Sequence, residues 1–257
     1  MKHIKRIAIT NEKGGVGKTM TAVNLSAILS ERGYKTLLID ADPQSSASAN
    51  FDLYHCPSPT LADVLKGTSL CTEAIRSTRF GVNVLPSSAD LTEFDLTLAS
   101  RKKNHDSYVS VFSDHLAPLK DYDFIIIDCP PQNCSLMDTI HYYADAVIIP
   151  MLAEDYGIQT LSAKVSTIAN IRRWINPRLQ MLGGLITMDE KRGLRSDYRA
   201  ILQEQTIFPI FRSTIRRNIT LVRAINAREP ICVFDKRSNG NLDYQAFADE
   251  LLGRIAE

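Results

Sequence analysis

The sequence lacks the features that mark membrane, secreted and metal-thiolate proteins. It has no run of about 18 apolar residues, so we predict no transmembrane helix. Its five cysteines form no Cys-x-x-Cys pair, which favours reduced and mostly buried thiols over a disulfide framework or a zinc site. The residues from Met1 to Arg6 lead into an apolar stretch that is too short for a signal peptide. These absences predict a cytoplasmic protein.

A strong charge imbalance is also missing. The formal net charge at pH 7 is +1, so any attraction to nucleic acid has to come from a local basic patch. The content of 44% hydrophobic and 23% charged residues is typical of a soluble globular protein. Because 257 residues lie near the upper limit for one hydrophobic core, we predict a single domain over residues 1–257.

Apolar runs alternate with amphipathic stretches along the chain. The runs are nearly continuous in Ile, Val and Leu, which strands covered on both faces require, and right-handed crossovers then place helices on both sides. The prediction is an α/β fold of the P-loop NTPase type, with a mostly parallel, twisted sheet. The predicted strands are Ile4–Thr10, Lys35–Asp40, Val82–Pro86, Asp123–Asp128, Asp145–Pro150, Gln180–Thr187 and Ile207–Phe211. The predicted helices include Lys18–Arg32, Gln159–Trp174 and Tyr244–Ile255.

A glycine-rich turn joins the first predicted strand to the first predicted helix. Its sequence is Gly14-Gly15-Val16-Gly17-Lys18-Thr19. Glycines let successive backbone N–H groups turn toward one anion, and a helix N-terminus adds about half a positive charge there. Lys18 can reach the β- and γ-phosphates of a nucleotide, and the Thr19 hydroxyl can bind Mg²⁺. A turn without a ligand is the alternative, but the preceding strand and following helix favour a phosphate site.

The segment from Lys13 to Thr19 resembles the deviant Walker A motif of the ParA/MinD family of P-loop ATPases, and in particular of its ParA/Soj-type partitioning proteins. In that family the first lysine reaches the ATP of the partner subunit. The resemblance therefore implies an ATP-bound sandwich homodimer with Lys13 at its interface, whereas a solvated loop lysine is the alternative. Residues 37–44 resemble the second acidic motif of the family, and residues 124–131 resemble its Walker B strand.

Three aspartates complete the predicted site. A carboxylate at the carboxyl end of a buried strand lies where ligands bind in open α/β sheets, so we expect Asp128 to hold Mg²⁺, with Asp40 as a second candidate nearby. The resemblance implies that Asp42 orients the attacking water. Alternatively, Asp40 and Asp42 only cap a turn. The predicted catalytic residues are Lys13, Lys18 and Asp42; the ATP-binding residues are Lys13, Gly14, Gly15, Val16, Gly17, Lys18, Thr19 and Met20; and the Mg²⁺ residues are Thr19, Asp128 and Asp40.

One position departs from the family pattern. A second threonine usually follows the Lys-Thr pair, and this chain has Met20 there. The backbone N–H is retained, but a hydroxyl contact to the α-phosphate is lost. One neutral hydrogen bond contributes about 0.5–1.5 kcal/mol, so we expect weaker ATP binding rather than loss of function.

The C-terminal third is rich in arginine. Residues 215–221 resemble the C-terminal signature of ParA-type proteins, with Arg216 in place of its usual proline. ParA-type proteins bind DNA nonspecifically as ATP-bound dimers, which implies a basic patch here; a solvated helix surface is the alternative. The candidate DNA-binding residues are Arg192, Arg195, Arg199, Arg216, Arg217 and Arg223.

The resemblance implies an ATP- and Mg²⁺-dependent partitioning ATPase, slow by itself and stimulated by a ParB-like partner, that coats the nucleoid in the cytoplasm. The chain ends in an acidic residue within the expected last helix, so we expect no membrane anchor of the MinD type. One alternative is a ParA-like switch that positions a protein cargo. Another is a small-molecule ligase of the dethiobiotin-synthetase kind, against which the Lys13/Lys18 pair argues.

Overall fold

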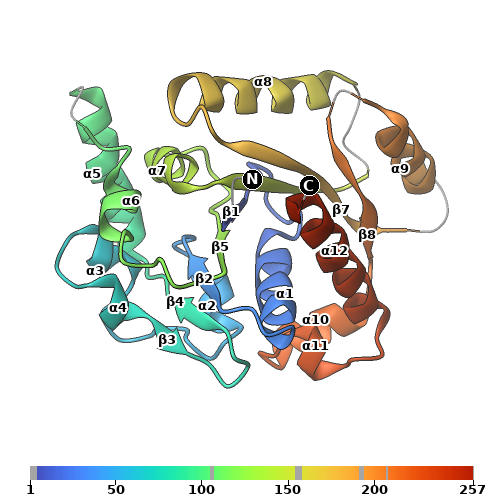
Figure 1. Cartoon of the computed structure of the whole chain (residues 1–257), viewed down its shortest axis with the longest axis horizontal. Helices are drawn as coiled ribbons and strands as arrows, with labels where there is room; N and C mark the ends of the chain where they lie inside the picture. Colours follow the sequence, from blue (N-terminus) through green and yellow to red (C-terminus); the bar gives the residue numbers. More distant parts are fainter. Residues whose placement is uncertain (1–4, 105–106, 154–157, 191–193, 207, 257) are drawn as a thin grey trace.

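The computed structural model describes residues 5–104, 107–153, 158–190, 194–206 and 208–256 (Figure 1). These residues form one eight-stranded sheet in the order β3-β4-β2-β5-β1-β6-β7-β8. All neighbouring strands are parallel except the edge pair β3 and β4. The strands are β1 (Arg6–Ile9), β2 (Thr36–Asp40), β3 (Arg76–Ser77), β4 (Asn83–Leu85), β5 (Phe124–Asp128), β6 (Ala146–Met151), β7 (Gln180–Asp189) and β8 (Ile210–Arg216).

Helices cover both faces of the sheet, and alternate residues of the central strands pack on opposite sides. Ala8 belongs to one hydrophobic cluster, while Ile7 and Ile9 belong to the other. The Ala8 cluster includes residues of α3 (Leu61–Leu65), α4 (Cys71–Ala74), α5 (Asp90–Lys103), α6 (Val111–His115), α7 (Ser135–Tyr143), α8 (Ile158–Trp174) and α9 (Leu194–Glu204). The other cluster includes residues of α1 (Lys18–Glu31), α2 (Ser46–Ala49), α10 (Ile219–Asn226), α11 (Ile231–Phe234) and α12 (Asn239–Ala256). Figure 1 shows α1 and α12 side by side on this face.

The predicted fold class is confirmed: a mostly parallel sheet lies between two helical layers. The last strand differs from the prediction, because β8 begins at Ile210 and continues to Arg216. Only Phe211 and Ile215 of β8 are buried, as expected of an edge strand, so the continuous apolar run of a buried parallel strand is missing here. The predicted first residue, Ile207, lies outside the described residues, as does Ile4. In the described part of the chain, no helix is long and apolar enough to cross a membrane.

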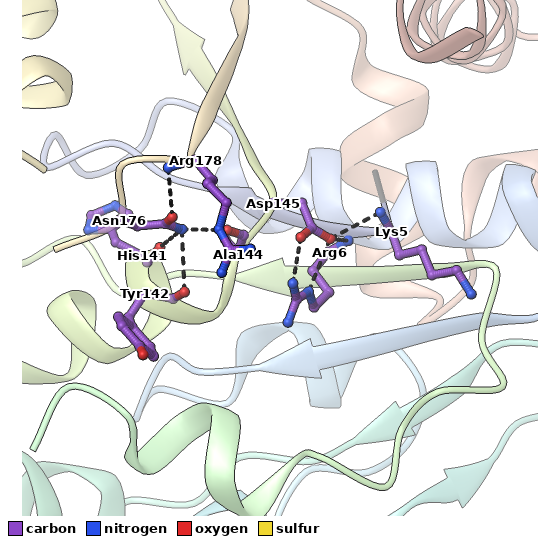
Figure 2. A network of polar contacts seen from close by, with 8 residues as sticks. All are labelled: Lys5, Arg6, His141, Tyr142, Ala144, Asp145, Asn176 and Arg178. Carbon is purple, nitrogen blue, oxygen red and sulfur yellow. Dashed lines mark hydrogen bonds and ion pairs between the residues drawn. The ribbon is translucent and has the colours of Figure 1, made fainter. Parts of the chain in front are cut away.

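Two polar anchors fix the amino end of β6 (Figure 2). Asp145 accepts hydrogen bonds from the backbone N–H of Arg6 and from its guanidinium, which joins β6 to β1. Asn176 donates its side-chain amide to the carbonyls of His141 at 2.9 Å and Ala144 at 2.9 Å. Asn176 also lies 3.3 Å from the Tyr142 carbonyl. The turn after α7 is thereby tied to the turn after α8.

Candidate functional site

The glycine-rich turn lies between the carboxyl end of β1 and the first turn of α1. Gly15 has φ +71° and Gly17 has φ +85°, which is the left-handed conformation that glycine adopts without strain. A Cβ atom added at Gly15 would meet no heavy atom within 4 Å, so the backbone conformation, and not crowding, requires glycine there. The first N–H groups of α1 follow directly, so this loop, called the cradle below, has a geometry that suits an anion.

The cradle is held by two side chains that the sequence analysis missed. The Thr187 hydroxyl at the end of β7 lies 2.8 Å from the Val16 carbonyl and 3.1 Å from that of Met151. Asn11 donates to the Pro150 carbonyl at 2.8 Å and accepts from the Lys13 N–H at 3.1 Å. Both residues are buried. Both are polar residues near the carboxyl end of a strand, β1 or β7. Because the carboxyl ends of parallel strands meet at one edge of the sheet, this position could have identified them in the sequence.

Lys18 is buried at the start of α1, with 7% of its surface exposed. Its ammonium Nζ lies 3.3 Å from the Lys13 carbonyl. Burial lowers the pKa of Lys18 below its ordinary value, while the charge of Asp128 acts in the opposite direction. A desolvated ammonium at the mouth of an amide cradle gains free energy when it meets an anion, because its own hydration has already been lost.

Asp128 lies at the carboxyl end of β5 and is fully buried. Neither of its carboxylate oxygens has a hydrogen-bond partner within the described residues. Burial first, and the neighbouring charge of Asp40 second, raise the pKa of Asp128 well above its ordinary value. The Thr19 hydroxyl opposes this rise, although no hydrogen bond of normal geometry joins the two groups. A buried carboxylate without donors, next to a hydroxyl and a phosphate cradle, fits a divalent cation.

Asp40 is equally buried and pairs with Asp128 in the register of β2 and β5. Its Oδ2 accepts from the N–H and the hydroxyl of Ser48, each at 2.7 Å, and its Oδ1 accepts from the Asp42 N–H at 3.2 Å. Burial raises the pKa of Asp40 to about 6. Because both oxygens already accept hydrogen bonds, Asp40 is better suited to shaping the loop than to binding Mg²⁺ directly.

Asp42 and Lys13 lie on the loops that surround the cradle. Asp42 is half-buried, and its Oδ1 accepts from the Gln44 N–H at 2.9 Å, so it caps a turn. Its Oδ2 makes no hydrogen bond to any described residue. Lys13 is exposed, and its carbonyl and N–H belong to the network that holds Lys18 and Asn11. The geometry brings Lys18, Thr19, Asp40, Asp42 and Asp128 to one edge of the sheet.

Met20 packs against the core cluster on the α1 side of the sheet. Its sulfur lies 3.0 Å from the Asn24 amide nitrogen, and the Asn24 oxygen accepts from the Ile231 N–H at 2.7 Å. The Met20 side chain therefore packs into the core and presents no hydroxyl.

The candidate DNA-binding arginines fall into two groups. Arg199 pairs with the buried Asp189 at 2.6 Å, and Arg216 pairs with Asp243 at 2.6 Å, which also accepts the Arg216 N–H. These two side chains are only 28% exposed, and each is used in an ion pair within the fold. Arg217 is 72% exposed and contacts Glu190 at 3.2 Å.

Arg223 on α10 is exposed, and no described acidic side chain pairs with it. Arg192 and the side chain of Arg195 lie outside the described part of the chain.

Comparison with known proteins identifies the family. A family profile described as an AAA domain matches residues 4–181. A protein of Pseudomonas putida is 37% identical over 97% of this chain and 95% of its own. The chromosome partitioning protein ParA of Caulobacter vibrioides is 32% identical, with 98% of this chain and 95% of its own covered. The sporulation initiation inhibitor protein Soj of Bacillus subtilis is 32% identical, with 96% and 98% covered.

Solved structures agree with this assignment. A structure described as cobyrinic acid a,c-diamide synthase from Mycobacterium smegmatis, with a bound ATP analogue and magnesium, has a TM-score of 0.80 and 29% identity, covering 97% of this chain and 94% of its own. A variant of Cyanothece McdA in complex with ATP has a TM-score of 0.83 and 25% identity, covering 98% of each chain. With the motif, the fold and these relatives in agreement, the chain belongs to the ParA/MinD family of P-loop ATPases.

Proposed function

We propose that this protein is a DNA-partitioning ATPase that binds DNA as an ATP-bound dimer and leaves it after hydrolysis. The buried Asp128, which has no hydrogen-bond donor within the described residues, carries the nucleotide part of the proposal. The relative named as chromosome partitioning protein ParA, which matches 98% of this chain, supports the cellular role.

The residues of the cradle account for binding of ATP with Mg²⁺. The loop N–H groups and Lys18 would hold the phosphates, while Thr19 and Asp128 would hold the cation. The cation supplies charge neutralisation at the phosphates. Asp42, whose Oδ2 makes no hydrogen bond within the described part, would orient the attacking water. Asp40 would keep the Asp42 loop in position through its bond to the Asp42 N–H.

Lys13 would complete the site from a second copy of the chain. It lies at the surface of the cradle, and its backbone is fixed by Asn11 and Lys18. A lysine that reaches the partner's nucleotide would make hydrolysis depend on dimerisation. A slow basal rate, raised by a ParB-like partner, follows if the loop positions are completed only in the assembled complex.

DNA binding would come from the exposed arginines. Arg217 and Arg223 remain candidates because their guanidinium groups are exposed, and Arg223 lacks an acidic partner among the described residues. Dimerisation would double this patch, and neutralisation of phosphates would make the affinity fall steeply with salt.

The test is DNA binding without nucleotide, with ADP and with ATP. We expect Lys18→Ala and Lys13→Ala to lose ATP-dependent binding, and Asp42→Ala to remain on DNA with ATP because it cannot hydrolyse it. Arg223→Ala should weaken binding and reduce the salt slope by about 1. Arg237→Ala, at another exposed arginine, is the matched control. DNA affinity that is independent of nucleotide would rule out the partitioning proposal and leave the ATPase intact.

A second function, the positioning of a protein cargo, is favoured by the similarity to McdA over 98% of the chain. The two functions share the ATPase cycle and differ in what the partner carries. The ParB-like partner itself would distinguish them: a partner that binds DNA sequence-specifically supports partitioning, whereas one that binds a protein assembly supports positioning.

A further inference from the structure

A second cavity adjoins the nucleotide site on the α7 and α8 side of the sheet. Its volume is about 540 Å³, which lies in the range of small-molecule pockets. At one end it reaches the segment from Thr10 to Glu12, just before the cradle, and at the other it reaches Trp174. The Asn176 anchor in Figure 2 fixes the far end, because it ties the last residues of α7 to the turn after α8.

A buried histidine in the wall of this cavity lacks a partner. His141 is 7% exposed, and its Nε2 has no hydrogen bond to any described residue. Burial lowers the pKa of His141 to about 4, so the imidazole is neutral at neutral pH. A neutral imidazole keeps one donor and one acceptor, and leaving either one buried and unpaired costs free energy. Because this nitrogen is buried below the cavity surface, a ligand would reach it only after the ring turns toward the cavity.

The charged groups of the cavity give no preference for an ionic ligand. Lys102 pairs with Asp138 at 2.7 Å, and Asp138 also accepts from the Tyr108 hydroxyl. Lys164 donates to Asn11 at 3.0 Å. With the exposed Glu12, the charges of the four charged residues in the described part of the lining sum to zero. A strongly charged ligand would therefore lose hydration without an opposite charge to replace it.

The remaining lining combines amides, apolar side chains and one aromatic ring. Gln132, Asn133 and Asn170 contribute side-chain amides, Ile168 and Ile171 belong to the apolar part, and Trp174 is 73% exposed. Side-chain amides match the donor and acceptor edges of heterocyclic bases, and indoles stack on their faces. We propose that this cavity is a second ligand site, for an uncharged hydrogen-bonding heterocycle of the nucleobase class.

The contacts of the cavity also connect it to the cradle. The Asn11 side-chain oxygen accepts from Lys164 of α8 and from the Lys13 N–H. A shift of α8 would therefore move the hydrogen bonds that position the phosphate loop. This connection rests on the proposed ATPase function. If a ligand in the cavity changes the affinity for nucleotide by some factor, nucleotide changes the affinity for that ligand by the same factor.

Trp174 is the single tryptophan of the chain and lines the cavity, so its fluorescence reports directly on ligand binding there. Protein saturated with a non-hydrolysable ATP analogue and Mg²⁺ is titrated with adenosine, guanosine and uridine, with ribose as the control. We expect a saturable change in Trp174 fluorescence for at least one nucleoside, with a dissociation constant on the order of 0.1 mM for about 20 heavy atoms. No saturable change with any of the three would overturn the proposal.

Two substitutions on α8 give a matched test. Thr167 lines the cavity and Ala169 does not, although both are exposed. Thr167→Phe should weaken nucleoside binding at least about tenfold by filling the cavity, and Ala169→Phe should leave it unchanged. His141→Leu should weaken it about tenfold, with folding checked by thermal unfolding. Wild-type affinity in Thr167→Phe would contradict the proposal.

The same titration on nucleotide-free Lys18→Ala separates the two proposals. If that variant binds nucleosides normally while the wild type fails to hydrolyse ATP, the proposed function fails and the second site stands. If the wild type hydrolyses ATP but neither protein binds nucleosides, the second site fails alone.

Discussion

The carboxyl ends of β2 and β5 each carry a buried aspartate, and the two differ in their hydrogen bonds. Asp40 accepts three hydrogen bonds, from Ser48 and from the Asp42 N–H, whereas Asp128 accepts none from the described residues. They are direct neighbours in the sheet and share the same burial. We infer two roles from this difference: Asp40 holds the Ser48 and Asp42 backbone in place, whereas Asp128 would gain its partner only when a cation binds.

The largest expected effect concerns Asp128. Asp128→Asn keeps the shape and removes the charge that would hold Mg²⁺, so we expect ATP hydrolysis to fall on the order of 100-fold or more. The nucleotide-free variant should be at least as stable as the wild type, because a buried carboxylate without donors has been neutralised. Hydrolysis and urea unfolding, measured on the same preparation, test both parts. Loss of stability together with activity would mean that Asp128 is a structural residue.

The next largest expected effect is on the free energy of unfolding and concerns Asp40. Asp40→Ala leaves the N–H groups of Ser48 and Asp42 without their acceptor, so we expect the free energy of unfolding to fall by about 2–4 kcal/mol. Asp128→Ala is the matched control, and it should cost clearly less because no donor loses a partner. Equal losses of unfolding free energy in the two variants would mean that the hydrogen bonds of Asp40 do not make it more important for stability than Asp128.

The raised pKa values of the two aspartates also predict how the stability of the nucleotide-free protein depends on pH. Burial raises the pKa of Asp40 to about 6 and raises that of Asp128, whereas both are near 4 in the unfolded chain. The contribution of Asp40 to stability is thus fully present below about pH 4 and is lost as the pH rises through about 6, by roughly 1–3 kcal/mol. The contribution of Asp128 is also lost as the pH rises, because its pKa is raised too.

Other carboxyls act in the opposite sense, so the measurement needs a reference. Hydrogen bonds lower the pKa values of Asp145 and Glu250, and these groups add stability as the pH rises. Subtracting the urea midpoint of the wild type from that of Asp128→Asn at each pH removes their effect, because both proteins contain them. We expect the midpoint of the variant to rise relative to that of the wild type between pH 4.5 and 7.5. A difference that does not vary with pH would contradict the raised pKa values.

The sequence predicted the parts of this site that depend on local chemistry. The turn from Gly14 to Thr19, its strand and its helix follow from residues close together in the chain, and the continuous apolar runs define the parallel sheet. It ranked Asp128 ahead of Asp40 for Mg²⁺, but the strand pattern does not predict their different hydrogen bonds, because both strands are apolar and end in an aspartate. The distinction depends on Ser48, whose placement by α2 the local pattern does not specify.

The sequence pattern could not predict contacts between residues that lie far apart in the chain. Thr187 holds a carbonyl 171 residues away, and Arg216 finds Asp243 27 residues further along. An arginine that is half-buried against an acid and one that is exposed look the same in a sequence. Only the folded positions separate Arg199 and Arg216 from Arg217 and Arg223.

The smallest expected effect examines how Asp40 is held. Ser48→Ala removes the hydroxyl that donates to Asp40 at 2.7 Å and accepts from the Ser87 N–H at 3.1 Å, while the Ser48 N–H still donates. We expect a loss of about 1 kcal/mol, well below that of Asp40→Ala, measured by urea unfolding. Ser46→Ala, at an exposed position of the same helix, is the control. If Ser48→Ala costs as much as Asp40→Ala, the hydroxyl alone satisfies the carboxylate. The two strand ends would then differ by one serine, and a donor placed near Asp128 would be enough to convert it into a structural residue.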